Sequence, residues 1–174
     1  MSPVPPDPRT TAVPVTPTHA SNATALAAMP ALAPKLPAAG RRVRSEALAG
    51  SADALSLAQL ALSCAKERHL LAIVAAAPLA AQRLAEEIPW FAPGLRVALL
   101  PDWETLPYDH FSPHQDLISE RLATLHHVRS QSCDVLVVPV TTALYPLPPV
   151  EYLAAFTFFP KRGERLDLAK FRRA

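Results

Sequence analysis

The sequence is short of several features on which common protein classes depend. Its 174 residues include two cysteines, Cys64 and Cys133, and four glycines. Two cysteines support neither a disulfide framework nor a zinc site, which fits a reducing cytoplasm. The longest apolar stretch, Leu70 to Ala81, is far shorter than the roughly 20 residues that a membrane-spanning helix needs, and the first residues lack the apolar core of a secretory signal. We therefore expect a cytoplasmic protein with no membrane span.

Charge of one sign is also scarce. The formal net charge is +2, which is too small to indicate nucleic-acid binding, since that function usually needs a strongly basic face. The basic residues gather in two places, one at residues 41–44 and the other at residues 161–173. We interpret both clusters as solvated surface, with a phosphate or acidic-partner site as the alternative.

Composition divides the chain into a tail and a folded part. Residues 1–40 hold nine of the twenty prolines and many alanines. Such a segment cannot bury enough apolar surface to offset the entropy of ordering it, so we predict a disordered tail. Residues 41–153 instead alternate between strand-like and helix-like patterns, and we expect them to form one domain.

The apolar patterns predict four strands joined by helices. The strands are expected at residues 43–49, 70–76, 95–100 and 134–140. The first helix should run from the Gly50-Ser51 turn to about Arg68, and Pro78 and Pro89 should begin and end the second. Ser112 should cap the third, with Pro113 in its first position and Gln115 completing the capping box. Alternating strands and helices imply a parallel sheet between helical layers, which is an α/β three-layer fold.

The first strand and its glycine turn stand where a P-loop protein holds phosphates, in the pattern G-x-x-x-x-G-K-[ST]. In this chain the turn reads Gly50, Ser51, Ala52, Asp53 and Ala54, so an aspartate replaces the lysine and an alanine replaces the hydroxyl that binds magnesium. A carboxylate repels a triphosphate. We therefore predict a degenerate P-loop that binds neither ATP nor magnesium.

Other catalytic or metal-binding patterns are weak. The last strand ends without the carboxylate that magnesium would need, and we interpret Asp134, at its start, as facing solvent. The acidic and imidazole groups of Asp109, His110, His114 and Asp116 are close in sequence, but Pro113 breaks the helical spacing of a metal-binding pair. His126 and His127 have no cysteine or carboxylate at ligand spacing. We expect no metal site and no nucleophilic catalysis.

One segment is distinctive. Residues 101–122 read PDWETLPYDHFSPHQDLISERL, which closely resembles the signature DWETLPYD-x-FSPHQD-x-IS-x-RL of the bacterial transcription-repair coupling factors (Mfd). The segments at residues 134–144 and 162–166 resemble the strand, the turn and the later segment that come after the signature in that family. The resemblance covers about residues 41–174, and it identifies the chain as similar to the N-terminal region of these factors.

The resemblance implies a fold similar to the first domain of the repair protein UvrB, a RecA-like ATP-binding domain, here in degenerate form. Residues 154–174 would begin a truncated UvrA-binding domain, with Arg172 as a candidate contact to UvrA. In the full-length family, ATP and Mg drive a DNA translocase that displaces stalled RNA polymerase, through parts outside this chain. The segment itself would be a non-catalytic interaction module. A UvrB-like DNA-binding repair protein and a free-standing Rossmann-like enzyme are the alternatives.

Overall fold

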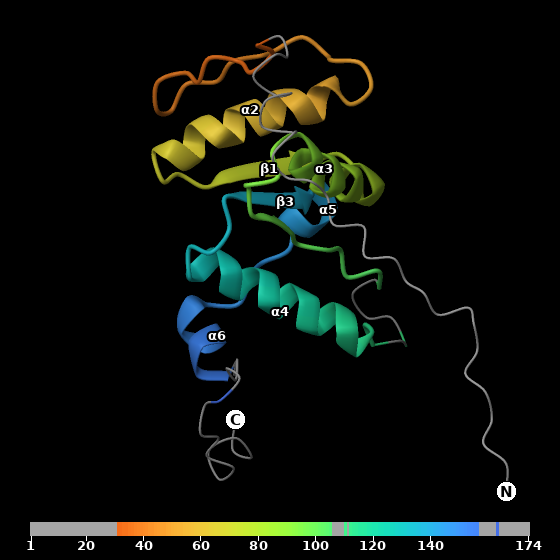
Figure 1. The fold of residues 1–174 in the computed structure, drawn as a ribbon. Coiled ribbons are helices and arrows are strands. Elements are labelled where there is room, and N and C mark those ends of the chain that lie inside the picture. Colours follow the sequence, from red (N-terminus) through yellow and green to blue (C-terminus); the bar gives the residue numbers. More distant parts are fainter. Residues whose placement is uncertain (1–30, 106–109, 111, 157–162, 164–174) are drawn as a thin grey trace, which may run out of the picture.

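The computed structural model describes residues 31–105, 110, 112–156 and 163, and these form a small parallel sheet with helices on both sides (Figure 1). In chain order the elements are α2 (Ala52–Lys66), β1 (Leu71–Ala75), α3 (Pro78–Phe91), β2 (Val97–Leu99), α4 (Gln115–Arg129), β3 (Val135–Pro139), α5 (Val140–Ala143) and α6 (Val150–Phe156). The prediction of an α/β fold with a parallel sheet is confirmed. No helix in the described part of the chain is both long and apolar enough to cross a bilayer.

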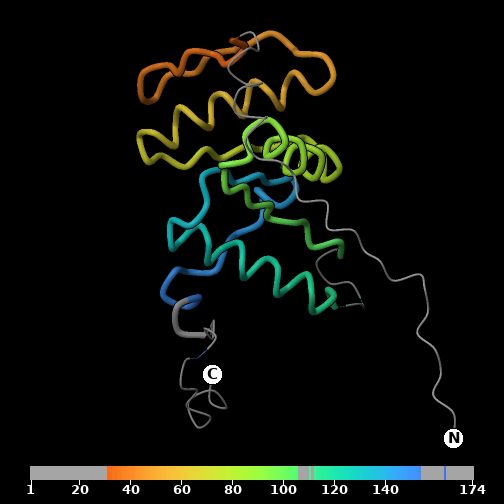
Figure 2. Tube along the Cα trace, viewed as in Figure 1, coloured from red at the N-terminus to blue at the C-terminus, as the bar shows by residue number. Residues whose placement is uncertain are grey.

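The sheet has the order β1-β3-β2, with the last strand in the middle. Ile73 of β1 and Leu99 of β2 both pair with Val137 of β3. The chain thus passes over the place of β3 to reach β2 and then turns back. Since such crossovers are right-handed, the two turns in opposite directions put α3 and α4 on opposite faces of the sheet. The traces agree, because α2, which packs against α3, lies on the opposite side of the strands from α4 (Figures 1 and 2).

The hydrophobic core lies between the sheet and the pair α2 and α3. On α2, Ala54, Ala58 and Ala61 recur at helical spacing and are fully buried. Alanines at these positions let the helix backbone come close to its neighbours. The core also contains Ala81, Leu84 and Ile88 of α3, Ile73 and Ala75 of β1, and Val135 and Val137 of β3. Apolar β-branched residues in β3 fit a strand that is covered on both faces.

The strand predicted at residues 43–49 is wrong. Residues 41–49 are exposed and none of them is in a strand, so the sheet of the described residues has three strands rather than four. The side chain of Val43 is 60% exposed. A strand needs a hydrogen-bonding neighbour and a buried face, and this segment has neither.

Two helix boundaries also differ from the prediction. Pro89 does not end α3 but lies inside its last turn, since the helix continues to Phe91. A proline this near the end removes one hydrogen bond, and few residues beyond it have to follow any bend. Ser112 does not cap α4. The cap is His114, whose ring nitrogen accepts the backbone N–H of Asp116 at 3.3 Å, so Pro113 precedes the helix.

Residues 31–33 contact α2, although they fall within the segment predicted to be a tail. The side-chain oxygen of Gln59 accepts the backbone N–H groups of Leu32 and Ala33 at 2.8 and 3.1 Å. The hydroxyl of Ser56 donates to the carbonyl of Leu32 at 3.0 Å, and Ser56 is buried. The composition of residues 1–40 could not show this contact, because its anchors lie on a later helix.

The Gln59→Ala variant is expected to loosen this contact and to lower the free energy of unfolding by about 1 kcal/mol, because two partly buried hydrogen bonds are lost. Trypsin should then cleave faster after Lys35. Urea denaturation and timed proteolysis measure the two effects. The matched control is Ser63→Ala, which removes a bond within α2 and should change neither. Equal cleavage of Gln59→Ala and wild type would show that the contact does not hold this segment.

Candidate functional site

The carboxyl edge of the sheet is the first candidate site, because open parallel α/β sheets bind ligands outside the carboxyl ends of their strands. Three segments of the chain leave the sheet at this edge. They are the turn at residues 76–77 after β1, residues 100–105 after β2, and α5 after β3.

Among the described residues, only the turn after β1 leads directly from a strand into a long helix. It consists of Ala76 and Ala77, followed by Pro78 and Leu79 at the start of α3. A phosphate cradle at this place would need glycines, a lysine and a hydroxyl. None of the four residues supplies any of these groups, and Ala77 makes no side-chain cap.

The residues predicted to be a degenerate P-loop, Gly50 to Ala54, lie elsewhere. They form the start of α2, with Gly50 at a φ of +56° and Ser51 directly before the helix. Within residues 31–49, the described residues before them, no strand is present, and residues 41–49 are exposed coil. A direct turn from a strand into a long helix is instead found after β1, where the sequence carries no trace of the motif.

Asp53 joins α2 to α3. Its carboxylate accepts two hydrogen bonds from the guanidinium of Arg83, at 2.6 and 3.2 Å, and Arg83 also pairs with Glu87 at 2.8 Å. The hydrogen bonds from Arg83 hold the pKa of Asp53 below its ordinary value. The aspartate that the sequence placed at a phosphate site is thus one half of an ion pair between two helices.

Asp102 organises the carboxyl edge between β2 and β3. Its oxygens accept the hydroxyl of Thr141 at 2.8 Å, the hydroxyl of Thr142 at 3.2 Å and the backbone N–H of Trp103 at 2.9 Å. Burial alone would raise the pKa of Asp102, but these hydrogen bonds and the charge of Arg121 lower it overall. The first aspartate of the signature segment therefore ties the ends of two neighbouring strands together.

Arg121 and Thr124 extend this polar cluster onto α4. Arg121 is only 4% exposed, donates to the carbonyl of Pro101, and stacks its guanidinium 4.0 Å from the ring centre of Trp103. The buried hydroxyl of Thr124 donates to the carbonyl of Leu99 at 2.9 Å. We call Asp102, Trp103, Arg121, Thr141 and Thr142 the edge cluster. Its groups mostly bond to one another, which makes it a structural joint rather than a set of reactive groups.

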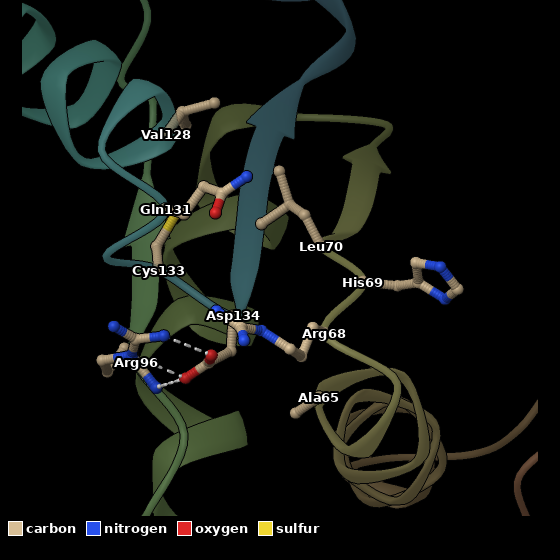
Figure 3. Close-up of a pocket in the computed structure, with 9 residues that line it drawn as sticks. All are labelled: Ala65, Arg68, His69, Leu70, Arg96, Val128, Gln131, Cys133 and Asp134. Carbon is tan, nitrogen blue, oxygen red and sulfur yellow. Dashed lines mark hydrogen bonds and ion pairs between the residues drawn. The ribbon is translucent and has the colours of Figure 1, made fainter.

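The opposite, amino edge of the sheet holds a pocket of about 370 Å³ between the last turns of α2 and α4 (Figure 3). Asp134 lies in this pocket with its side chain 18% exposed, so the prediction that it faces solvent is wrong. Arg96 donates its backbone N–H, Nε and Nη2 to this carboxylate at 2.9, 3.0 and 2.7 Å. Arg96 precedes β2 and Asp134 precedes β3, and the two meet because parallel strands begin at the same edge of the sheet. The position of Asp134 in the sequence did not reveal this partner.

The remaining predicted site residues are not brought together. Arg172 and Asp109 lie outside the described residues. His114 pairs with Asp116 at 3.3 Å, and both side chains are exposed. His127 contacts the hydroxyl of Ser132 at 2.8 Å. Within the described ranges, no three histidine, cysteine or acidic residues are grouped as a metal site would require.

Sequence reasoning missed the edge cluster because α4 was interpreted through its apolar residues. Leu117, Leu122 and Leu125 are half-buried, while the buried positions of the helix are Arg121 and Thr124. A signal was present. Leu117, Arg121 and Thr124 lie on one helical stripe, and an arginine on such a stripe usually has a specific partner when it is buried.

Comparison with known proteins gives one consistent answer. No family model matches the chain. The chain is 43% identical to the transcription-repair-coupling factor of Escherichia coli over 122 residues, which are 69% of the chain and 10% of that protein. It is 36% identical to the factor of Haemophilus influenzae over 70% of the chain, and 34% identical to that of Myxococcus xanthus over 76%. The chain spans only about a tenth of the length of these relatives.

Proposed function

We infer, from a relationship to the transcription-repair-coupling factors that covers most of this chain, that the chain is a non-catalytic interaction module of such a factor. The module is a degenerate copy of a RecA-like, UvrB-like nucleotide-binding domain. In this proposal it lies in the cytoplasm and offers its folded surface to a partner protein, while ATP-driven displacement of RNA polymerase on DNA belongs to other parts of the factor.

The observation that carries this proposal is the turn after β1. A nucleotide-binding domain of this type holds phosphates with backbone N–H groups of a glycine-rich turn and with a lysine at the start of the following helix. The turn has Ala76, Ala77 and Pro78 instead. Pro78 has no N–H group, and alanines restrict the backbone that glycines would leave free.

The edge cluster supports the same proposal. Three hydrogen bonds occupy the oxygens of Asp102, and a carboxylate held in this way is a poor general base or metal ligand. Arg121 is committed to Pro101 and Trp103. The side chains at the usual ligand edge thus stabilise the sheet.

The partner proposed is UvrA, which the family resemblance indicates. In the experiment, the full chain is tested in parallel for binding to UvrA, to a DNA duplex and to a fluorescent ATP analogue with Mg²⁺. UvrA should be retained, and the nucleotide should show no saturable binding up to about 1 mM, the upper end of ordinary substrate affinities. Salt-dependent DNA binding would instead favour a UvrB-like DNA-binding protein, and saturable nucleotide binding would favour an enzyme.

Two arginine variants sharpen the UvrA arm of this experiment. Arg172→Ala should weaken UvrA capture, because Arg172 is the candidate contact, whereas the neighbouring Arg173→Ala serves as the control of equal charge. Equal loss in both variants would show that general charge attracts UvrA and would remove Arg172 as a specific contact.

A further inference from the structure

The pocket at the amino edge of the sheet is separate from the edge cluster, at the other ends of the same strands. Its volume is about 370 Å³, and its walls come from α2, α4 and the residues that precede each strand. Ala65, Leu70 and Val128 give it an apolar side, while Arg68, Arg96 and Gln131 give it polar groups (Figure 3). An apolar wall with a few polar groups is the usual composition of a ligand site.

The acceptor within the pocket is already engaged. Both oxygens of Asp134 receive hydrogen bonds from Arg96, at 2.7 to 3.0 Å. The Asp134 carboxylate has little capacity left for a cation or a hydrogen-bond donor. The pair also fixes the Arg96 guanidinium at the pocket wall, since two bonds from its Nε and Nη2 determine its orientation.

Two further donors in the pocket, the side chains of Arg68 and Gln131, are not engaged. Among the described residues, no ion pair or side-chain hydrogen bond involves Arg68 or Gln131. Each of these two residues closely follows the end of a helix, α2 or α4, with a left-handed backbone at φ of +59° and +54°. Figure 3 shows the Arg68 side chain extending toward Asp134, whereas the His69 ring points away. His69 pairs with Glu67 at 3.3 Å.

These groups select a ligand that brings acceptors and a single negative charge. Arg68 and Arg96 carry two positive charges against the one negative charge of Asp134. The carboxyl ends of α2 and α4 add partial negative charge, which disfavours a dianion such as phosphate more strongly than a single carboxylate. A guanidinium matches the two oxygens of a carboxylate.

We propose that this pocket binds a carboxylate group carried on a short apolar stem. Arg68 holds the carboxylate, Gln131 donates a further hydrogen bond, and Leu70 and Val128 contact the stem. The carboxylate belongs either to a small free acid or to an acidic side chain of a protein segment.

Two probes distinguish these sources, sodium butyrate and the peptide acetyl-Ala-Leu-Glu-Ala-amide, each titrated into the full chain while NMR follows the arginine Nε–H signals. Saturable shifts of the Arg68 signal support the proposal. Tighter binding of the peptide identifies a protein segment as the source, and tighter binding of butyrate identifies a small acid. Sodium phosphate is titrated in parallel, and binding of phosphate as tight as that of either carboxylate overturns the choice of ligand.

The variant Arg68→Gln should weaken binding about tenfold, since a charged hydrogen bond is lost. Arg129→Gln removes an exposed arginine from the last turn of α4 outside the pocket, and it should change affinity less than twofold. Gln131→Ala gives a second, milder loss, and circular dichroism confirms that each variant is folded. Absence of saturable binding by both carboxylates, or equal affinity in Arg68→Gln and wild type, overturns the proposal.

Discussion

The Arg121→Met variant is expected to lower the free energy of unfolding by about 2 kcal/mol, although methionine fills a similar volume. The arginine is buried, donates to the carbonyl of Pro101 and stacks on Trp103. Without it, a carbonyl loses its charged donor and the cation–π contact disappears. Asp102 also loses the nearby positive charge that helps to lower its pKa.

Urea denaturation followed by circular dichroism measures this loss. Arg129→Met is the matched control, because Arg129 lies on the same helix and is exposed, so its replacement should change stability by less than about 0.5 kcal/mol. Trp103 fluorescence adds a local readout and should shift only in Arg121→Met. If both variants unfold at the same urea concentration, the edge cluster does not stabilise the fold.

The Ile88→Ala variant should have the larger effect, a loss of about 3 kcal/mol, because it opens a cavity in the core. The Ile88 side chain has no exposed surface and belongs to the cluster that joins α3 to the sheet. A domain of ordinary stability has only about 5–15 kcal/mol in total, so this single change removes a large share.

Leu79→Ala provides the control on the same helix, since the Leu79 side chain is 80% exposed and should contribute less than about 0.5 kcal/mol. Thermal and urea unfolding of the two variants should therefore differ clearly. Similar losses for Leu79→Ala and Ile88→Ala would place the core on the other face of α3.

The sequence predicted the elements whose burial pattern is simple. The strands at residues 71–75 and 135–139 are short runs of apolar residues, and such runs indicate parallel strands in an α/β context. β3 is buried as this pattern indicates, whereas β1 has one exposed face, on which Val74 is 60% exposed. The helix after Ser51 also lies where its apolar stripes indicated. In these segments local pattern and tertiary packing favour the same structure.

The prediction errors occur where a partner far away in the sequence determines the structure of a segment or the role of a side chain. Residues 43–49 have a strand-like pattern, but they pair with no strand in the described chain. Because that strand is absent, the P-loop comparison at Gly50 to Ala54 lost its structural basis. Asp53 and Asp134 both bind arginines far away in the sequence, at Arg83 and Arg96, and no local pattern shows such pairs.

The signature segment could be recognised from sequence, but the partners of its side chains could not be inferred. Asp102, Trp103 and Arg121 were notable for their resemblance to a family, and the structure shows that all three belong to one joint between β2, β3 and α4. Contacts between a loop and a helix 20 residues apart have no periodicity that a sequence pattern could reveal.

The strand order has a consequence for how the chain folds. β3 is central, and its register pairs Leu71 and Val97 with the same residue, Val135. β1 and β2 are therefore not neighbours. Each of them pairs with β3, so neither can join the sheet until β3 has left the ribosome. The chain must lose the entropy of closing long loops before any hydrogen bonds between strands can form, and this slows folding. Until then α2, β1 and α3 expose apolar surface, so this interval of synthesis is when the chain is most open to aggregation or to chaperones.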